Sequence, residues 1–371
     1  MSEEMKTIVI TAAGTGGHVM PGLAVAREVR ARGWSVEWIG TTTGMEGALV
    51  QKDTIPFHAV DFQGIRGKGL WGSAKNTLKM VAAFFKARRL LKQIQPKAVF
   101  STGGYIAVPV ALAARNCHIP IILMNCDADL LMSTDIVRPY VDAIACGFAG
   151  GARSQSKGKG YITGNPVRAD IMALTDVRRR LSGRTGPLKL FVFGGSLGAK
   201  VLNEVLPEAL ALIPEQERPL VVHQTGRDRD EAVRQAYERC GVKADVRPFI
   251  DDMAKEYAEC DLVMCRSGAT SVSEICAAGV PAILVPFVAK TTTHQLGNAR
   301  YMAGQEAAIL LEQPDVSPER VKALLMDLTR ERLIALGEKA HTLGKKYATR
   351  NVADLIEAVV EQRKPNESEF L

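Results

Sequence analysis

The sequence lacks several features that would place it in a common class of proteins. Its 371 residues include no run of about 20 uninterrupted apolar residues, the length that a transmembrane helix needs. Residues 1–6 carry two acids and no apolar stretch, so we expect no secretory signal peptide there. The seven cysteines are odd in number and are never spaced as C-x-x-C. We therefore expect reduced cysteines in apolar surroundings and no structural zinc site.

Two nucleotide-binding signatures are also missing. A G-x-x-x-x-G-K-[ST] phosphate loop occurs nowhere in the chain. The glycine loop at 14–18 has Val19 where the dinucleotide fingerprint G-x-G-x-x-G needs its third glycine. The next strand ends at Gly40 without the acidic residue that binds ribose in such sites. These absences argue against a P-loop enzyme and against a dehydrogenase.

Acidic residues are missing from residues 62–97, which carry nine lysines and arginines. The rest of the chain has 38 basic and 40 acidic residues, so this segment accounts for the net charge of +7. Apolar side chains lie between the charges, as in a surface that binds an anionic membrane. The alternative is an ordinary helix with a buried apolar face and solvated lysines. Nucleic-acid binding would need a recognition motif, which we do not find, so we expect no nucleic-acid partner. The predicted membrane patch comprises Arg66, Lys68, Trp71, Lys75, Lys79, Phe84, Phe85, Arg88 and Arg89.

Short apolar strands alternate with helical patterns along the whole chain. The predicted strands span 7–12, 36–40, 98–100, 119–124, 188–193, 220–223, 246–249, 262–264 and 282–285, and the clearest helices span 21–32, 74–93 and 348–362. A chain of this length is long enough to form two hydrophobic cores. We predict an α/β protein of two Rossmann-like domains, each with a parallel sheet, joined near residues 164–166.

Glycine-rich loops follow strands in both predicted domains, at 14–18, 101–105 and 194–199. Unpaired N–H groups at a helix N-terminus favour an anion, and loops of this kind at two sheet edges predict a ligand in a crevice. The segment 265–274 adds Ser267 at a predicted helix start and Glu274 about two turns later. A carboxylate there can accept hydrogen bonds from vicinal ribose hydroxyls. Taken alone, a solvated helix glutamate is the plainer interpretation.

As an ordered set, these motifs resemble the MurG family of peptidoglycan glycosyltransferases, family 28. The motifs that carry the resemblance are 14–18 with 21–24, 64–69, 164–168, 194–199, 249–253, 265–274 and 294–299, and they extend over nearly the whole chain. The resemblance implies the GT-B fold, two Rossmann-like domains facing across a cleft with a C-terminal helix that crosses back. The implied domains are 1–164 on the acceptor and membrane side, 165–345 on the donor side, and 346–371 as the returning helix and tail.

The resemblance also implies an activity. It is the inverting transfer of GlcNAc from UDP-GlcNAc to the MurNAc 4-hydroxyl of lipid I (undecaprenyl-pyrophosphoryl-MurNAc-pentapeptide), forming lipid II. This hexosyltransferase would use no cofactor and no essential metal. It would lie peripherally on the cytoplasmic face of the inner membrane, with cell-wall synthesis and division proteins as candidate partners. The alternatives are another GT-B glycosyltransferase with a glycerolipid acceptor, a UDP-GlcNAc 2-epimerase, and a catalytically silent UDP-sugar-binding scaffold.

Carried over by position, the resemblance assigns residues to both substrates. Ile250 would bind uracil through its backbone, Glu274 the ribose, and Gln295 the sugar hydroxyls. The donor-binding set is Thr15, Gly16, Gly17, Asn125, Asp127, Arg168, Ser196, Ile250, Ser267, Gly268, Ala269, Glu274, His294 and Gln295. The acceptor-side set is Gly14, Gly103, Gly104 and Tyr105.

The chain departs from the commonest family form at three places. Leu197 stands where glutamine is usual, residues 124–129 read MNCDAD where the common form is His-Glu-Gln-Asn, and residues 288–293 replace a segment rich in His and Asp. Because of the second change, either Asn125 or Asp127 could take the role of the asparagine at the sugar.

An inverting transfer needs a base near the acceptor hydroxyl, and His18 is the expected one. Imidazole accepts a proton near neutral pH, and a helix N-terminus disfavours the charged form. The alternative is a loop histidine that binds the structure or a phosphate. The isolated histidines are expected to be structural; they are His58, His118, His223 and His341.

Overall fold

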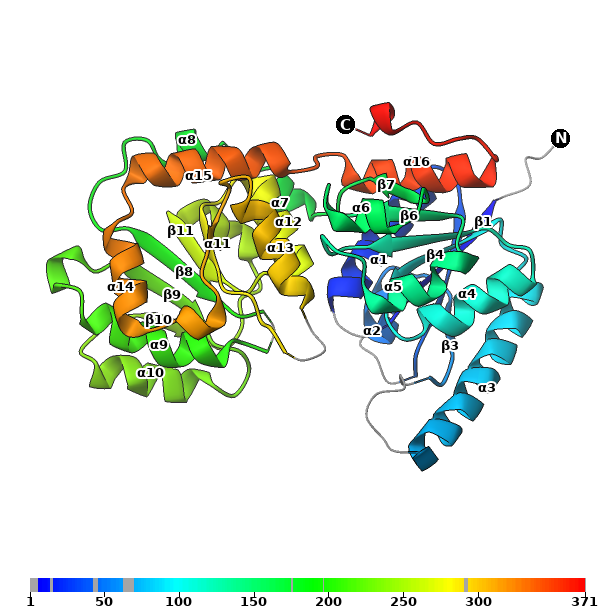
Figure 1. Cartoon of the computed structure of the whole chain (residues 1–371), viewed down its shortest axis with the longest axis horizontal. Coiled ribbons are helices and arrows are strands. Elements are labelled where there is room, and N and C mark those ends of the chain that lie inside the picture. Colours follow the sequence, from blue (N-terminus) through cyan, green and yellow to red (C-terminus); the bar gives the residue numbers. More distant parts are fainter. Residues whose placement is uncertain are drawn as a thin grey trace. The chain divides into compact units, whose positions relative to one another are not determined.

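The computed structural model describes residues 6–13, 16–42, 46–62, 70–174, 176–195, 197–289 and 293–370, with only the backbone for 70–76 and 369. Contacts within the chain divide it into two compact units. Unit 1 is Met1–Pro166 with Tyr347–Leu371, and unit 2 is Val167–Lys346. Each unit has one parallel sheet with crossover helices (Figure 1), which confirms the predicted α/β fold class of two Rossmann-like halves.

The described part of unit 1 has a sheet in the order β3-β2-β1-β4-β5-β6-β7. Its strands are β1 (Thr7–Ala12), β2 (Ser35–Gly40), β3 (Phe57–Ala59), β4 (Ala98–Gly103), β5 (Ile121–Asn125), β6 (Ala143–Cys146) and β7 (Gly160–Ile162). Its helices are α1 (Gly16–Ala31), α2 (Glu46–Lys52), α3 (Leu70–Ile94), α4 (Ala107–Asn116), α5 (Met132–Val137), α6 (Gly151–Gln155) and α16 (Ala348–Val360). The strand order reverses between β1 and β4, and ligands bind at such reversal points in open parallel sheets.

Unit 2 repeats this plan, with its described strands in the order β10-β9-β8-β11-β12-β13. The strands are β8 (Lys189–Phe193), β9 (Leu220–Gln224), β10 (Asp245–Arg247), β11 (Leu262–Cys265), β12 (Ala282–Leu284) and β13 (Ile309–Leu310). The helices are α7 (Ala169–Met172), α8 (Val177–Leu181), α9 (Lys200–Ala211), α10 (Asp230–Arg239), α11 (Met253–Glu259), α12 (Ala269–Ala278), α13 (His294–Ala303), α14 (Pro318–Met326) and α15 (Arg330–Leu343). Here the order reverses between β8 and β11.

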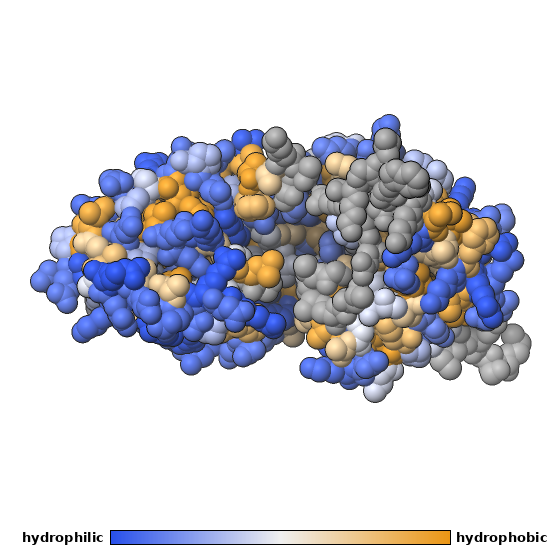
Figure 2. All heavy atoms as spheres, turned by 90° about the horizontal axis from the view of Figure 1, so that it is seen from below, coloured by the Kyte–Doolittle hydropathy of each residue, from blue (hydrophilic) through white to orange (hydrophobic). Residues whose placement is uncertain are grey.

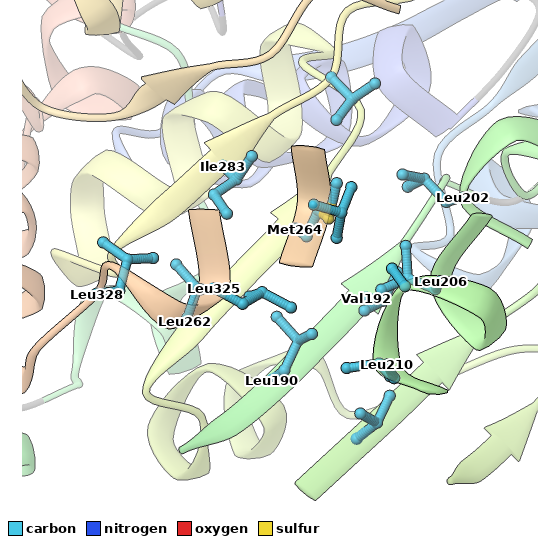
Figure 3. Packing of buried hydrophobic residues seen from close by; sticks show 14 of the residues in the cluster. Leu190, Val192, Leu202, Leu206, Leu210, Leu262, Met264, Ile283, Leu325 and Leu328 are labelled. Carbon is cyan, nitrogen blue, oxygen red and sulfur yellow. The ribbon is translucent and has the colours of Figure 1, made fainter. Parts of the chain in front are cut away.

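The core of unit 2 shows why these residues form these elements. Leu202, Leu206 and Leu210 recur every four residues of α9, so they share one helix face. That face lies over Leu190 and Val192, alternate residues of β8 that point to the same side of the sheet (Figure 3). The apolar residues that recur along the helix and those that alternate along the strand therefore pack together in one buried layer.

The C-terminal helix α16 packs against α1 within unit 1. At the end of α1, Arg32 Nη1 donates to Asp354 Oδ1 at 2.6 Å and to Glu357 Oε2 at 2.9 Å. The side chain of Asn351 is buried and donates from Nδ2 to the carbonyl oxygen of Thr163 at 3.0 Å. Segments that lie far apart in the sequence therefore form one core (Figure 1).

Several predicted boundaries differ from the observed ones, and proline is involved in two of these differences. The first helix begins at Gly16, not at Pro21, and Pro21 lies inside it, where it has no N–H to donate to the carbonyl of Gly17 one turn earlier. Strand β10 ends at Arg247, not at Phe249, because the next residue, Pro248, cannot donate a hydrogen bond to a sheet ladder.

Replacing Asn351 with alanine should destabilise unit 1. The Thr163 carbonyl would remain buried without this donor, a loss that costs about 1–3 kcal/mol. Urea unfolding should show a lower midpoint for Asn351→Ala, while Arg350→Ala, an exposed side chain on the same helix, serves as the matched control. Equal midpoints for the two variants would contradict the assigned role of Asn351.

Candidate functional site

The two glycine loops of unit 1 meet at one edge of its sheet. Strands β1 and β4 pair in parallel, so the segments that follow them emerge side by side. Gly104 has a φ of +82°, and a Cβ at this position would lie 2.4 Å from the carbonyl oxygen of Ala13. Only glycine permits this approach of the two backbones. Gly14 and Thr15 of the predicted site lie outside the described residues.

His18, in the first turn of α1, is held against the second loop. Its Nδ1 lies 2.8 Å from the carbonyl oxygen of Thr102, and Thr102 Oγ1 donates to the carbonyl oxygen of His18 at 2.7 Å. A carbonyl oxygen only accepts, so Nδ1 carries the proton of the neutral ring and Nε2 keeps its lone pair. A Cβ on Gly103 would lie 3.3 Å from His18 Cε1. The geometry therefore presents His18 in a tautomer that can accept a proton at Nε2.

Asn125 is the last residue of β5, and Asp127 lies in the loop that follows it; both side chains are buried. Asn125 Nδ2 donates to the carbonyl oxygens of Asp127 at 2.8 Å and Asp129 at 3.0 Å, and its Oδ1 accepts from the backbone N–H of Leu131. Both amide hydrogens of Asn125 are therefore used to shape this loop. A contact of either residue with the sugar stays a prediction, as does the acceptor role of Tyr105, whose side chain is exposed.

In unit 2 the loop after β8 packs tightly on the loop after β9. Gly198 has a φ of +69°, and a Cβ there would lie 1.8 Å from the carbonyl oxygen of Thr225. Gln224 Nε2 donates to the carbonyl oxygen of Gly195 at 3.2 Å. Gly195 and Gly198 are thus held by the end of the neighbouring strand β9 and the residue after it; Ser196 of the predicted site lies outside the described residues.

Helices α12 and α13 begin next to each other at the same sheet edge. Ser267 is fully buried, and its Oγ donates to the carbonyl oxygen of Gln295 at 2.8 Å, while Asn298 Nδ2 donates to the carbonyl oxygen of Ser267 at 3.0 Å. Gly268 is the N-cap of α12 and has no side chain to accept the N–H groups of the first turn, which begins at Ala269. Those N–H groups can therefore bind an anion.

His294 and Gln295, at the start of α13, are half-buried. Gln295 Oε1 accepts from the backbone N–H of Phe287 at 2.9 Å. Ile250 is buried three residues after β10. The structure thus places these predicted residues on loops and helix starts of unit 2, and their contacts with a ligand stay predictions.

Glu274 lies on the inner face of α12, so the interpretation as a solvated helix glutamate is wrong. Its Oε1 accepts from Arg168 at Nη2 (3.1 Å) and Nε (3.3 Å), and its Oε2 accepts from the hydroxyl of Tyr257 at 3.2 Å. Burial raises the pKa of Glu274, and the opposing effects of Arg168 and Tyr257 are smaller. Burial also raises the pKa of Tyr257 well above its ordinary range, so its hydroxyl stays a neutral donor.

The sequence did not point to Tyr257, to Thr102 as the partner of His18, or to Asn298 as the partner of Ser267. Each acts through a contact between separate elements, which neither periodicity nor spacing encodes. Asn298 and Thr102 at least lie in the motifs at 294–299 and 101–105, whereas Tyr257 belongs to none of the motifs found in the sequence.

Three other reactive side chains, those of His223, Cys260 and Cys276, are buried within unit 2. His223 is buried, its Nδ1 lies 2.9 Å from the hydroxyl of Tyr237, and burial lowers its pKa to about 3, so it is neutral. Burial raises the pKa of the Cys260 and Cys276 thiols to about 12, which makes them poor nucleophiles. Within the described ranges, no group of three or more His, Cys, Asp or Glu side chains could hold a metal ion.

Helix α3 has both a buried face and an exposed apolar face. Ala83, Ala87 and Leu91 pack in the core of unit 1. Phe84, predicted as part of the membrane patch, is partly buried against that core. Leu78, Val81 and Phe85 are 71%, 44% and 58% exposed. Figure 2, which views the side of the molecule that is lowest in Figure 1, shows apolar and hydrophilic residues interspersed over this unit. No helix in the described ranges is both long enough and apolar enough to span a bilayer.

The remaining members of the predicted membrane patch are less uniform. Lys79 and Arg88 are half-buried, and Arg88 Nε donates to Asn116 Oδ1 at 2.6 Å, whereas Arg89 is exposed. Arg66 and Lys68 lie outside the described residues, and only the backbone is described for Trp71 and Lys75.

Comparisons with known proteins match both units. Residues 8–146 match the glycosyltransferase family 28 N-terminal domain, and residues 189–359 match the glycosyltransferase family 28 C-terminal domain. The chain is 46% identical over 352 residues to the UDP-N-acetylglucosamine–N-acetylmuramyl-(pentapeptide) pyrophosphoryl-undecaprenol N-acetylglucosamine transferase of Chromobacterium violaceum, covering 94% of this chain and 97% of that protein. The protein of the same name from Methylibium petroleiphilum is 46% identical over 358 residues, covering 95% and 97%. The crystal structure of Acinetobacter baumannii MurG is 35% identical with a TM-score of 0.81, covering 95% of this chain and 99% of that one.

Replacing Glu274 with glutamine should stabilise unit 2 increasingly as the pH rises. Because burial raises the pKa of Glu274, ionising it costs the folded state free energy. This cost is absent below the ordinary glutamate pKa of about 4.3 and is complete above the raised value. The melting temperature of Glu274→Gln relative to the parent should therefore be higher at pH 8 than at pH 5. Glu259→Gln, at an exposed position, should show no such trend; a trend of opposite sign for Glu274→Gln would refute the burial cost.

Proposed function

Because the chain belongs to the MurG family of glycosyltransferases, family 28, we propose that it transfers GlcNAc from UDP-GlcNAc to lipid I and so forms lipid II. Lipid I is the N-acetylmuramyl-(pentapeptide) pyrophosphoryl-undecaprenol named for the relatives. The structural observation that carries this proposal is the buried Glu274 carboxylate on α12, a helix whose N-terminus has no side-chain cap. One element thus offers an acceptor for ribose hydroxyls and N–H donors for a diphosphate.

In the proposed donor site, unit 2 binds UDP-GlcNAc from the uracil to the sugar. Glu274 accepts hydrogen bonds from the ribose, and the backbone at Ile250 contacts the base. The N–H groups at Ser267, Gly268 and Ala269, with those of the loop at 194–199, bind the diphosphate. Gln295 and His294, at the start of α13, contact the transferred sugar. Either Asn125 or Asp127 of unit 1 takes the role of the asparagine that is usual at the sugar in this family.

The proposed reaction inverts the configuration at C1 of GlcNAc. The 4-hydroxyl of the MurNAc residue attacks C1 from the face opposite UDP, and His18 Nε2 takes the hydroxyl proton as the new C1–O bond forms. The bond between C1 and the β-phosphate oxygen breaks, and its electron pair leaves with UDP. Helix N-termini of unit 2 stabilise this negative charge. The tautomer fixed by Thr102 supports the role of His18 as the base.

The proposed acceptor is a membrane lipid, and α3 supports a peripheral contact with the cytoplasmic face of the membrane. Its exposed Leu78, Val81 and Phe85 can enter the interface while Lys86 and Arg89 meet anionic headgroups. Each basic residue near such a surface contributes about 1 kcal/mol. Cell-wall synthesis and division proteins are candidate partners at the same surface.

Replacing His18 with alanine should remove the base and leave the donor site of unit 2 intact. We expect kcat to fall about 10²- to 10⁴-fold, the usual contribution of general-base catalysis, with little change in the Kd for UDP. Transfer of labelled GlcNAc to a short-chain lipid I analogue measures kcat, and calorimetry measures Kd. His118→Asn changes an exposed histidine with a φ of +57°, which asparagine tolerates, and should keep full activity. Near-normal turnover of His18→Ala would exclude the base role.

Replacing Leu78, Val81 and Phe85 together with glutamine should release the protein from anionic vesicles. Glutamine keeps the helix and removes the apolar contact. Flotation with phosphatidylglycerol vesicles should recover the parent and a control that carries Leu212→Gln and Leu220→Gln, exposed residues of unit 2, but not the α3 variant. Flotation of the parent that does not depend on anionic lipid would count against the membrane proposal.

A further inference from the structure

Tyr257 is the most deeply buried group that touches Glu274. It lies on α11 with no exposed surface, and its hydroxyl donates to Glu274 Oε2 at 3.2 Å. Its ring packs edge-on against Phe191 and Phe193 of β8, with centroids 6.1 and 6.2 Å away. The hydroxyl thus reaches the carboxylate from a ring that is packed on β8 and has no exposed surface.

The backbone of Tyr257 is tied to α12 as well. Arg180 Nη1 donates to the carbonyl oxygen of Tyr257 at 2.7 Å, and its Nη2 donates to the carbonyl oxygens of Ala278 at 2.5 Å and Gly279 at 3.0 Å. One half-buried guanidinium thus joins α11 to the C-terminal end of the helix that carries Glu274. The distance from the Tyr257 hydroxyl to the carboxylate is therefore fixed by both main chain and side chain.

Counting acceptor positions distinguishes the two partners of Glu274. A carboxylate offers about four lone-pair sites, two on each oxygen. Arg168 uses two sites on Oε1 and Tyr257 uses one on Oε2, which leaves one. Two ribose hydroxyls need two sites, so one existing donor must yield. The Arg168 side chain is 36% exposed and can move, whereas Tyr257 is enclosed.

We propose that Tyr257 is a positioning residue for the donor: it holds the Glu274 carboxylate at a fixed angle while the ribose replaces part of the contact with Arg168. The proposal rests on the proposed function, in which Glu274 binds the ribose. Tyr257 never touches the substrate in this account. It determines how well the carboxylate discriminates a nucleotide with both ribose hydroxyls from one that lacks a hydroxyl.

The test compares UDP-GlcNAc with its 2′-deoxy and 3′-deoxy forms in the full-length enzyme. In Tyr257→Phe, the ring and its packing remain and only the hydroxyl is lost. We expect KM for UDP-GlcNAc to rise about tenfold, the effect of losing one hydrogen bond to a charged group, with kcat changed less than about twofold. The preference for the ribose donor over the deoxy donors should fall by a similar factor.

Tyr237→Phe is the matched control, because Tyr237 is equally buried in unit 2 and its hydroxyl contacts His223 instead of Glu274. It should lower the melting temperature comparably and leave the ribose preference unchanged. In a Glu274→Gln background, Tyr257→Phe should have no further effect on that preference. If Tyr257→Phe unfolds near the assay temperature, equilibrium binding of UDP and 2′-deoxy-UDP at lower temperature gives the same ratio.

The outcomes distinguish the positioning role of Tyr257 from the role of Glu274 at the ribose, on which it rests. A Tyr257→Phe enzyme with the parental ribose preference overturns the positioning role of Tyr257. An equal loss of ribose preference in Tyr237→Phe also overturns it, since the loss would then result from a general destabilisation of unit 2. A parent enzyme that does not distinguish ribose from deoxyribose donors, or a Glu274→Gln variant that keeps the parental KM, overturns instead the role of Glu274 at the ribose.

Discussion

The close approach of neighbouring main chains at two sheet edges is the constraint on which both candidate sites depend. In unit 1 the loop after β4 reaches the end of β1 at Gly104, and in unit 2 the loop after β8 reaches the end of β9 at Gly198. Neither contact leaves room for a Cβ. Because the backbones are in contact, the sheet restrains the positions of the side chains and N–H groups next to them. His18 is held in this way, through two hydrogen bonds to Thr102.

Two buried carboxylates of unit 2 show how function and stability are divided. Asp261 accepts from Arg184 Nη1 at 2.8 Å and from the N–H of Lys189 at 2.9 Å, donors that belong to the fold. Glu274 is also buried, but its charged partner, Arg168, is partly exposed, and burial leaves its pKa raised. The first carboxylate closes a structural network. The second keeps an incompletely compensated charge at the position where we propose that the ribose binds, and perturbed pKa values of this kind cluster at functional sites.

Sequence periodicity predicted the two parallel sheets because buried strands are continuous apolar runs, as at β1 and β8, and the glycine loops marked their carboxyl ends. It also indicated Glu274, through the spacing from Ser267 along one helix. It did not indicate that Glu274 is buried, since burial depends on α11 and on the segment before α7. The boundary errors at Pro21 and Phe249 both involve proline: α1 continues through Pro21 although proline lacks an N–H to donate, and β10 ends before Pro248. Asn125 illustrates a further limit, because its use in shaping its own loop follows from three-dimensional contacts alone.

The discontinuous make-up of unit 1 has a consequence for how the chain folds as the ribosome produces it. Residues up to Pro166 emerge long before α16, which supplies the buried side chains of Val352, Leu355 and Ile356 to the same unit. Unit 2 is continuous, so all of its residues are present first. The nascent chain therefore carries an uncovered apolar surface on its N-terminal part until α16 has been synthesised, and unit 1 can be completed only after all residues of unit 2 have emerged.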